Sequence, residues 1–331
     1  MPATPDPVEH VKTAVVVLNW NGAEDTLACL RSLSNGSSPP PLIIVVDNAS
    51  TDDSVFLIRQ STLADVVLEN RENLGFAEGN NVGIRHALAL DVDVVAILNN
   101  DTLASAAAIN ELASLAAWSR QLIAISPIIR YVDSSDIWFQ GGVVDRGWPR
   151  HLQADEVQAA HDGKMRETET LSGCCIVADR RVWTKNGLFD PAYFLIFEDS
   201  EWSVRARRCG VTLFVAPTVE IAHKVSRSFT GSTALLAAFY FARNGLRFVR
   251  THHSRHLPRF LVKWVLRPTA SAIVRRRPKQ ELGFRWLGVA AFAVNQSGQA
   301  PQWVMRRARR ASASAAGEAS FAASRLGERS E

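Results

Sequence analysis

Carboxylate and amide side chains follow three apolar, β-branched segments in the N-terminal half of the chain. Asn19, Asp47 and Asp101 lie at or just beyond the ends of these segments. A carboxylate such as Asp47 can accept hydrogen bonds from the N–H and O–H groups of a base or a ribose. Asp101 is a hard oxygen ligand suited to Mg²⁺ or Mn²⁺, which reach proteins through one or two carboxylates together with substrate phosphates. For both residues the alternative is helix capping, because acids and their polar neighbours also cap the helices that follow.

Glycine recurs at every fourth position between residues 73 and 83, at Gly75, Gly79 and Gly83. On a helix these glycines share one face, and each costs about 1 kcal/mol relative to alanine. Such a face indicates the close approach of a ligand or of another segment of backbone. Amide side chains nearby favour the ligand, and tight packing of the helix on a sheet is the alternative. These amides are Asn73, Asn80 and Asn81.

Three carboxylates lie between aromatic residues in the sequence FEDSEW, and they belong to Glu198, Asp199 and Glu201. Clustered acids in apolar surroundings repel one another and lose hydration. Both effects raise the pKa of a carboxylate toward the range of a general base. The alternative is a helix start, because acids favour the first turn of a helix.

A single histidine, His223, follows the apolar segment 219–222 and precedes a strongly basic region. A lone histidine is more often structural than a ligand. Its neighbours Lys224 and Arg227 would nevertheless suit a ligand that carries phosphate.

The elements that position these residues alternate between strand and helix. Continuous apolar runs are typical of strands buried on both faces of a parallel sheet, and the segments between them have helical periodicity. The alternation predicts an α/β fold with a doubly wound, mostly parallel sheet, in which ligands bind outside the carboxyl ends of the strands. The predicted strands are 14–18, 42–46, 66–69 and 92–98, and the predicted helices are 24–34, 54–61, 75–90 and 103–118. The polar stretch 151–170 is predicted to be a mobile surface loop.

The net charge of +4 conceals a strong asymmetry along the chain. Residues 1–130 carry 7 Lys and Arg against 15 Asp and Glu, whereas residues 224–310 carry 18 Lys and Arg against Glu281 alone. The basic region fits an anionic partner, and its interleaved aromatic residues favour an acidic membrane surface over nucleic acid. Ordinary amphipathic helices that pack on the rest of the chain are the alternative. The helices predicted in this region are 234–250, 257–274 and 282–294.

Composition and missing motifs exclude several classes of protein. With 331 residues, 47% hydrophobic and 21% charged, the chain is an ordinary globular protein. The absence of G-x-G-x-x-G, Walker, G-x-S-x-G and H-E-x-x-H motifs disfavours dehydrogenases, P-loop NTPases, serine hydrolases and zincins. No apolar run reaches the roughly 18–20 residues that span a bilayer, and the start of the chain lacks a secretory pattern. We therefore predict a cytoplasmic protein, peripheral on the inner face of the cell membrane.

Taken in order, these segments resemble the inverting family-2 glycosyltransferases of GT-A fold, and most of all the rhamnosyltransferase-like branch that builds bacterial cell-surface polysaccharide. The resemblance covers about residues 12–250 and rests on the ordered set rather than on one motif. The matching segments are VVVLNWNG (15–22), VVDNASTDDS (45–54), ENLGFAEGNNVG (72–83), LNNDT (98–102), FEDSEWSVRARRCG (197–210) and IAH (221–223). We expect a GT-A-like catalytic domain at 1–225, a basic helical region at 226–310 and a disordered tail at 311–331.

The resemblance implies a metal-dependent hexosyltransferase with a nucleotide-sugar donor, a divalent cation (Mn²⁺ or Mg²⁺) and a glycan or lipid-linked acceptor. Rhamnose is one candidate sugar. Asp199 would be the general base, with Glu198 beside it, and Asp101 and His223 would contact the metal or the diphosphate. The donor would lie against Asn19, Asp47, Asn73, Gly75, Asn80 and Asp101, and the acceptor against Gly173, Cys174 and Trp202.

The metal motif of this family is often Asp-x-Asp, whereas this chain has Asn99-Asn100-Asp101. The neutral first position is usual in the rhamnosyltransferase-like branch, but it removes one charge and predicts modest metal affinity. Two other functions stay open. One is a sugar-phosphate nucleotidyltransferase, although its Gly-rich basic loop after the first strand is absent. The other is a non-catalytic protein that binds nucleotides or glycans on the same fold.

Overall fold

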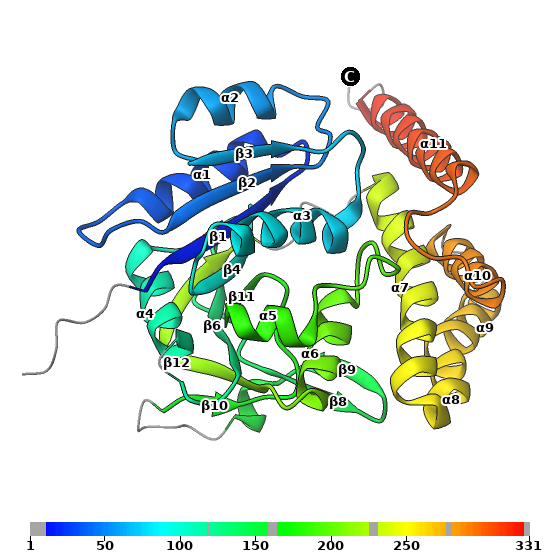
Figure 1. Ribbon diagram of the computed structural model, residues 1–331. Helices are drawn as coiled ribbons and strands as arrows, with labels where there is room; N and C mark the ends of the chain where they lie inside the picture. The colour runs from blue at the N-terminus through cyan, green and yellow to red at the C-terminus, as the bar shows by residue number, and fades with distance from the viewer. Residues whose placement is uncertain (1–10, 118, 158–163, 225–230, 276–279, 328–331) are drawn as a thin grey trace, which may run out of the picture. The chain divides into compact units, whose positions relative to one another are not determined.

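A computed structural model describes residues 11–117, 119–157, 164–224, 231–275 and 280–327, with side chains as far as residue 314 (Figure 1). The chain divides into two compact units. The first unit contains Met1–Pro191 and Glu198–Val225, and the second contains Ala192–Phe197 and Ser226–Glu331. A six-residue segment in the middle of the chain thus belongs to the second unit, although its neighbours in sequence belong to the first.

A mixed sheet forms the centre of the first unit. Its strands are β1 (Thr13–Asn19), β2 (Leu42–Asp47), β3 (Val66–Glu69), β4 (Val94–Asn99), β5 (Thr102–Leu103), β6 (Ile123–Tyr131), β7 (Ile137–Phe139), β10 (Arg166–Glu167), β11 (Cys175–Asp179) and β12 (Thr212–His223). The order is β10-β12-β6-β11-β4-β1-β2-β3, with β5 on β12 and β7 on β6. Strands β4, β1, β2 and β3 are parallel, as are β6 and β12, while β11 runs antiparallel between β4 and β6. A separate hairpin joins β8 (Gly142–Asp145) to β9 (Trp148–His151).

Helices cover both faces of this sheet, which confirms the predicted α/β fold with a mostly parallel central sheet. They are α1 (Ala23–Ser34), α2 (Ser54–Ser61), α3 (Gly75–Ala89), α4 (Ala106–Ala117), α5 (Arg180–Asn186) and α6 (Glu198–Arg208), with a 3-10 turn η1 (Ala154–Glu156). Alternate residues of β1 enter different cores, because successive side chains of a strand point to opposite faces.

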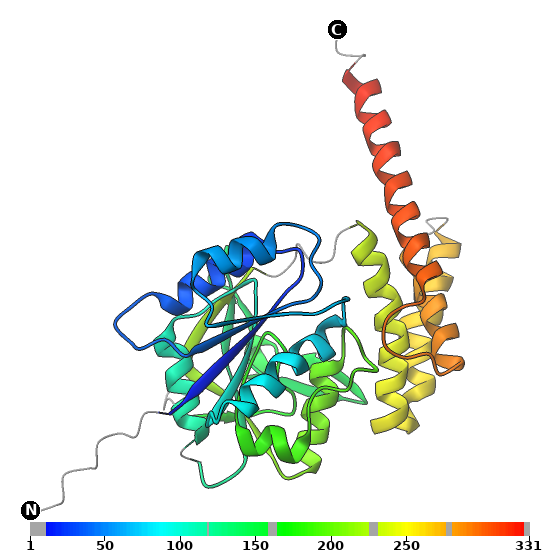
Figure 2. The same cartoon turned by 45° about the horizontal axis from the view of Figure 1, so that its top comes forward.

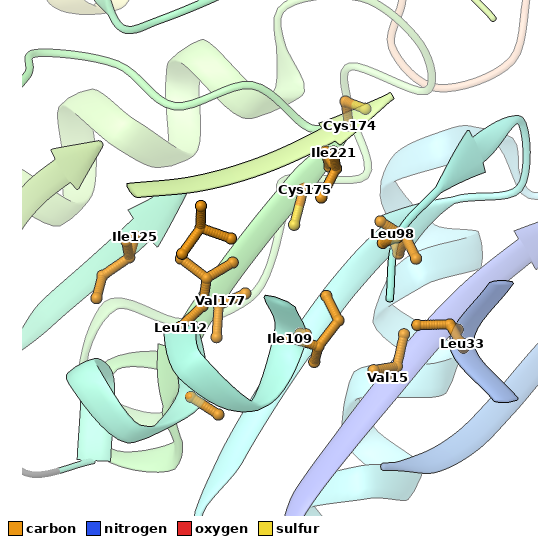
Figure 3. Packing of buried hydrophobic residues seen from close by; sticks show 14 of the residues in the cluster. Val15, Leu33, Leu98, Ile109, Leu112, Ile125, Cys174, Cys175, Val177 and Ile221 are labelled. Carbon is orange, nitrogen blue, oxygen red and sulfur yellow. The ribbon is translucent and has the colours of Figure 1, made fainter. Parts of the chain in front are cut away.

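The core on the first face contains Val15 and Val17 of β1 and packs against α1 and α4. Figure 3 shows part of it, with Leu33 of α1 and Ile109 of α4 among the strand side chains. The core on the second face contains neighbouring β1 residues and packs against α3, α5 and α6. Burial on both faces is the physical reason why these strands read as continuous apolar runs.

Two local predictions differ from the structure. The helix expected from residue 103 begins at Ala106, because residues 102–103 pair with β12 and Ser105 caps the helix through the N–H of Ala108. Asp101 therefore does not cap that helix. The stretch 151–170, expected to be a surface loop, contains η1 and β10 and buries Thr168 and Thr170, while its residues 158–163 lie outside the described residues.

Helices form the second unit. They are α7 (Gly231–His252), α8 (Leu257–Leu261), α9 (Arg267–Val274), α10 (Gln280–Ala293) and α11 (Gln302–Gly327), with a 3-10 turn η2 (Ser254–His256) and a π-helical turn η3 (Val262–Leu266). Helices α8, α10 and α11 contact α7, and aromatic residues of α7 and α10 form their shared core. Figure 2 shows α11 as one long helix. The expected disordered tail from residue 311 is helical to Gly327, because alanine has the highest helix propensity.

Within the described part of the chain, every helix is too short or too polar to cross a bilayer.

Candidate active site

The strand register brings the predicted polar residues to one edge of the sheet. Asn19 of β1 pairs with Asp47 of β2, and Leu18 of β1 pairs with Asn99 of β4. Because β1, β2 and β4 are parallel, their carboxyl ends meet at this edge, where ligands of such sheets bind. The sequence-based prediction of a shared polar edge is consistent with this register.

Asn19 and Asp47 form one buried network. Asn19 Nδ2 donates to Asp47 Oδ1 at 2.7 Å and to Ser50 Oγ at 3.1 Å, while Asn19 Oδ1 accepts from Thr26 Oγ1 at 2.7 Å. The Asp47 carboxylate also accepts from the hydroxyl and the backbone N–H of Ser50. Asn19 is fully buried, and its amide forms hydrogen bonds within the protein. Asn19 therefore holds Asp47 in place, and its contact with the nucleoside stays a prediction.

A second amide network shapes the start of α3. Asn48 Nδ2 donates to Asn73 Oδ1 at 3.1 Å and to Gly75 O at 3.0 Å, and Asn48 Oδ1 accepts from the N–H of Leu74 at 3.0 Å. Asn73 Oδ1 also accepts from the N–H of Gly75, whose φ of 78° favours glycine. Asn48, which the sequence analysis did not select as a site residue, thus organises the turn that carries Asn73 and Gly75.

The glycine face of α3 packs directly on the sheet. A Cβ atom at Gly79 would lie 2.7 Å from Leu18 Cδ1, and one at Gly83 would overlap Val16 Cγ1. Side chains at these positions would push the helix off the sheet, and such overpacking costs about 1–3 kcal/mol. Helix–sheet packing, the alternative to a ligand, therefore explains Gly79 and Gly83.

The two amides of α3 are also used within the fold. Asn80 is 1% exposed and donates to Phe76 O at 2.9 Å. Asn81 donates to the backbone oxygen of Phe189 and accepts from its N–H. The side chain of Asn80 is thus buried within the protein, and its place in a nucleotide pocket stays a prediction.

Asp101 and His223 meet where β5 pairs with β12. His223 Nε2 lies 2.9 Å from Asp101 Oδ1, and both side chains are largely buried. Burial lowers the pKa of His223, but its interactions with Asp101 and Cys174 outweigh this effect and raise the pKa to about 10. His223 Nδ1 is buried and has no hydrogen-bond partner among the described residues.

This pair has the spacing of two adjacent metal ligands. In octahedral Mg²⁺ coordination with bonds of about 2.1 Å, neighbouring ligand atoms lie about 3 Å apart. His223 Nε2 and Asp101 Oδ1 can each bind a metal once the proton between them is lost. In the part of the chain described here, no cluster of three or more His, Cys, Asp or Glu side chains could hold a metal. The residues therefore fit a cation that takes its remaining ligands from a diphosphate and from water.

Lys224 brings a fixed positive charge to the same end of β12. Its Nζ donates to Asp25 Oδ1 at 2.5 Å, and its backbone N–H donates to Asp101 O at 3.0 Å. Arg227, the other cation expected to suit phosphate, lies outside the described residues.

Asp199 lies half-buried in the first turn of α6, and both of its carboxylate oxygens are held. The N–H of Gly173 donates to Oδ2 at 3.0 Å, and Ser200 donates to Oδ1 from its N–H at 2.6 Å and from its hydroxyl at 3.1 Å. A Cβ atom at Gly173 would lie 3.2 Å from the ring of Phe76 and 3.5 Å from Asp199 Cβ. Gly173 is buried and orients Asp199, and its contact with the acceptor stays a prediction.

The same loop reaches the Asp101–His223 pair. Cys174, the residue after Gly173, has its Sγ 3.4 Å from Thr102 Oγ1, and Thr102 follows Asp101 in the chain and pairs with His223. Cys174 is only 2% exposed, and its contact with the acceptor stays a prediction. The Gly173–Cys174 loop therefore extends from the carboxylate of Asp199 to the strand pair that carries Asp101 and His223.

Two ring side chains that the sequence analysis did not select complete this region. The ring centroid of Trp138 lies 4.7 Å from that of His223 and 5.0 Å from that of His151. Burial lowers the pKa of His151, whereas the charge of Asp199 raises it, so His151 is within electrostatic reach of Asp199. Neither residue belongs to a motif, and only the pairing of β7 and β9 with their neighbours places them here.

Glu198 has a different environment from its neighbour Asp199. It is 6% exposed, and its Oε2 has no hydrogen-bond partner among the described residues. Burial, with the charge of Asp199 as the second cause, raises the pKa of Glu198 to about 8. Glu198 lies beside Asp199 in the first turn of α6, and its role next to the general base stays a prediction.

The pKa of Glu198 predicts a pH-dependent stability. An acid whose pKa is raised on folding stabilises the protein fully below its unfolded pKa, and this stability is lost as the pH rises through the folded pKa. The loss therefore runs from about pH 4.5 to about pH 8, with a slope of at most about 1.4 kcal/mol per pH unit. We expect the wild type to melt at a lower temperature at pH 8 than at pH 5.

In Glu198→Gln, which removes this ionisation, the difference in melting temperature should shrink. Glu72→Gln, at an exposed position, is the matched control and should keep the wild-type dependence. Thermal unfolding followed by circular dichroism measures both. An unchanged pH dependence in Glu198→Gln would contradict the raised pKa.

Trp202 belongs to the core on the second face of the sheet. It is fully buried, and its Nε1 donates to Gly187 O at 3.0 Å. Its ring packs against Trp183 and Phe189, with centroids 4.9 Å and 6.1 Å away. Its contact with the acceptor stays a prediction.

Comparison with known proteins finds one family. Residues 10–242 match the family model described as glycosyltransferase like family 2. Among curated proteins, the low-salt glycan biosynthesis hexosyltransferase Agl10 of Haloferax volcanii is 24% identical over 63% of this chain, and the match spans 66% of that relative, slightly under two thirds of its length. The N-acetylglucosaminyl-diphospho-decaprenol L-rhamnosyltransferase of Mycobacterium tuberculosis is 26% identical over 65% of this chain and 76% of its own.

Solved structures share the fold at low sequence identity. The mannosyltransferase PcManGT from Pyrobaculum calidifontis, solved with GDP-Man and Mn²⁺, is 17% identical, has a TM-score of 0.53 and covers 97% of this chain and 83% of its own. GalNAc-T7, solved with UDP, GalNAc and Mn²⁺, is 15% identical, has a TM-score of 0.56 and covers 82% of this chain and 59% of its own. The fold is that of the GT-A glycosyltransferases.

Proposed function

The chain belongs to glycosyltransferase family 2, and on that basis we propose that it is an inverting, metal-dependent hexosyltransferase. It moves a sugar from a nucleoside diphosphate donor to a hydroxyl group of a glycan or lipid-linked acceptor. The observation that carries this proposal is the Gly173–Cys174 loop: Gly173 orients the half-buried Asp199, and Cys174 contacts Thr102, which follows Asp101 and pairs with His223. A base and a diphosphate site that lie on one loop are the two parts that the reaction needs.

In the proposed reaction the acceptor oxygen attacks the anomeric carbon while the bond from that carbon to the diphosphate oxygen breaks. Asp199 takes the acceptor proton. Hydrogen bonds from Gly173 and Ser200 fix the direction of its carboxylate without using all of its lone pairs. A single displacement of this kind inverts the anomeric configuration.

The diphosphate leaves only if its growing negative charge is stabilised. When bound between Asp101 and His223, a divalent cation would supply that stabilisation. Lys224 adds a positive charge beside Asp101. Asp47, Asn73 and Gly75, at the carboxyl edge of the sheet, are the proposed contacts of the nucleoside.

The proposal is tested by release of nucleoside diphosphate from purified protein. A panel of UDP-, dTDP- and GDP-sugars is incubated with Mn²⁺, Mg²⁺ or EDTA, with and without lipid-linked glycan acceptors. Release from one donor, suppressed by EDTA, supports the proposal. Formation of pyrophosphate from a nucleoside triphosphate and a sugar phosphate would show a nucleotidyltransferase instead. No product in either assay, with no change in melting temperature from any nucleotide, would favour a non-catalytic binding protein.

The second unit carries a surface suited to an anionic membrane. Exposed cations and exposed apolar side chains alternate along residues 259–275, which we call the basic face. The cations are Arg259, Lys263, Arg267 and Arg275, and the apolar residues are Val262, Leu266, Ile273 and Val274. Such a face lies in the interface of an anionic bilayer, with its apolar side chains among the lipids. We propose that it attaches the protein peripherally to the cytoplasmic face of the membrane, where lipid-linked acceptors are available.

Reversal of charge on the basic face should weaken this attachment. For Lys263→Glu with Arg267→Glu we expect at least about a tenfold loss of binding to anionic vesicles, because each cation contributes about 1 kcal/mol near such a surface. The control, Arg31→Glu with Arg120→Glu, reverses two exposed charges of the first unit. Flotation with anionic and with zwitterionic vesicles measures the binding. Equal binding to both kinds of vesicle would contradict the proposal.

A further inference from the structure

Three residues just before α6 have backbone conformations that bulky side chains avoid. Phe194, Ile196 and Phe197 have φ values of 59°, 70° and 78°, in the left-handed region. Such conformations persist only where the surrounding structure enforces them, and they gather at functional sites. These residues belong to the segment 192–197 of the second unit, which runs directly into α6, where Asp199 is the second residue.

One buried amide of α7 holds this segment. Asn244 is fully buried, and its Nδ2 donates to the carbonyl oxygens of Tyr193 at 2.6 Å, Leu195 at 2.7 Å and Ile196 at 2.9 Å. An amide nitrogen has two hydrogens, so at least one of them is shared between carbonyls. The backbone course of residues 193–196 is therefore built around the side chain of Asn244.

Arg243 orients that amide. Its Nε donates to Asn244 Oδ1 at 2.9 Å, which turns Asn244 Nδ2 toward the segment. Its Nη2 lies 3.3 Å from Tyr193 O, and its Nη1 donates to Gln296 Oε1 and to Gly298 O at 2.7 Å. Burial lowers the pKa of Arg243 to about 10, which leaves the guanidinium charged at neutral pH. Because the buried guanidinium of Arg243 donates to backbone and amide oxygens, its position is fixed, and so is that of Asn244.

Aromatic contacts hold the side chains of the same segment. The ring of Phe194 stacks on Tyr240 at 5.3 Å, and the ring of Phe197 packs against Phe248 at 5.6 Å. A Cβ atom at Gly245 would lie 3.1 Å from Phe197 Cζ, so the residue after Asn244 leaves room for that ring. Backbone and side chains of the segment are thus both held by one stretch of α7.

We propose that Asn244 and Arg243 are positioning residues for the general base. The proposal rests on the proposed function, in which Asp199 takes the acceptor proton. A peptide bond joins Phe197 directly to Glu198, the first residue of α6, so the hydrogen bonds to residues 193–196 restrict the backbone that leads into α6. The proposed effect on Asp199 passes through this covalent connection.

The test compares Asn244→Asp and Arg243→Lys with the wild-type full chain. Aspartate has the shape of asparagine but cannot donate to the three carbonyls, and lysine keeps the charge but lacks the fork that orients Asn244. We expect kcat to fall about 10²-fold in both variants, with donor affinity within about twofold. Arg250→Lys, at an exposed position of the same helix, is the matched control and should keep the wild-type kcat.

Hydrogen exchange measured by mass spectrometry provides a second readout. Amides of residues 193–203 should exchange faster in both variants, while those of β1, β2 and β4 should exchange as in the wild type. A folded variant with wild-type kcat, or with kcat and donor affinity lowered together, would overturn the proposal.

If Asn244→Asp does not fold, Arg243→Lys decides by the same criteria, and failure of Arg243→Lys to fold would also count against a role limited to positioning. A wild-type protein that turns over no donor refutes the proposed function alone. In that case, exchange in residues 193–203 decides whether Asn244 and Arg243 hold the start of α6.

Discussion

Asp199→Asn is expected to lower the rate of sugar transfer at saturating donor by about 10²- to 10⁴-fold, the usual contribution of a general base. The amide keeps the shape of the carboxylate, and its one oxygen can accept either from Gly173 or from Ser200, but it cannot take the acceptor proton. Donor affinity should stay within about twofold, because the loss is confined to the transition state. Steady-state kinetics and calorimetric titration of the donor product measure the two effects.

The neighbouring acid supplies a matched control for this prediction. Glu198→Gln makes the same chemical change one residue earlier, at a carboxyl group that is already protonated below about pH 8. Transfer at pH 7 should therefore persist in Glu198→Gln. Retained turnover in Asp199→Asn would remove Asp199 from the mechanism, and equal losses in both variants would indicate disruption of α6 instead.

Asp101→Ala is expected to have the second largest effect, because it removes one of two protein groups proposed to hold the cation. The His223 imidazole is then left without its carboxylate partner. Loss of stabilisation of the leaving diphosphate should lower transfer by about 10²-fold or more, as the removal of an electrostatic stabiliser commonly does. The Mn²⁺ concentration needed for nucleotide binding should rise at the same time. Nucleotide titrations at a series of Mn²⁺ concentrations measure that shift.

Asp93→Ala is the control for Asp101→Ala. Asp93 precedes β4, at the opposite end of the strand from Asp101, and accepts from the backbone N–H of Lys12. Its removal should leave the Mn²⁺ dependence unchanged. The metal assignment fails if Asp101→Ala binds nucleotide with the wild-type Mn²⁺ dependence, or if EDTA has no effect on the wild type.

Much of the fold was predictable because local patterns and tertiary packing agree. The β-branched segments 14–18 and 42–46 favour extended backbone locally, and the sheet buries them on both faces, so local preference and packing both make them strands. The start of α4 was predicted wrongly, because residues 102–103 pair with a strand more than a hundred residues later in the chain. Local sequence contains no information about such a partner.

Residue type alone selected the candidate site residues, because carboxylates and an imidazole carry chemistry that few other side chains can. The structure holds Asp101 against His223 and orients Asp199, which the sequence could not show. It also buries Asn19, Asn80 and Trp202, whose polar groups form hydrogen bonds within the protein. Burial could not be predicted from residue type, because it depends on what packs above the residue.

The sequence by itself determined the family, the α/β class, and the set of acids and cations from which a site can be made. The tertiary structure decided the different environments of two adjacent acids: burial raises the pKa of Glu198 to about 8, whereas Asp199 is half-buried and oriented by Gly173. It also decided that segment 192–197 belongs with α7 rather than with its neighbours in the chain. The physical reason is that desolvation, and the partners of a strained backbone, come from residues far away in sequence, whereas composition and periodicity report only local preference.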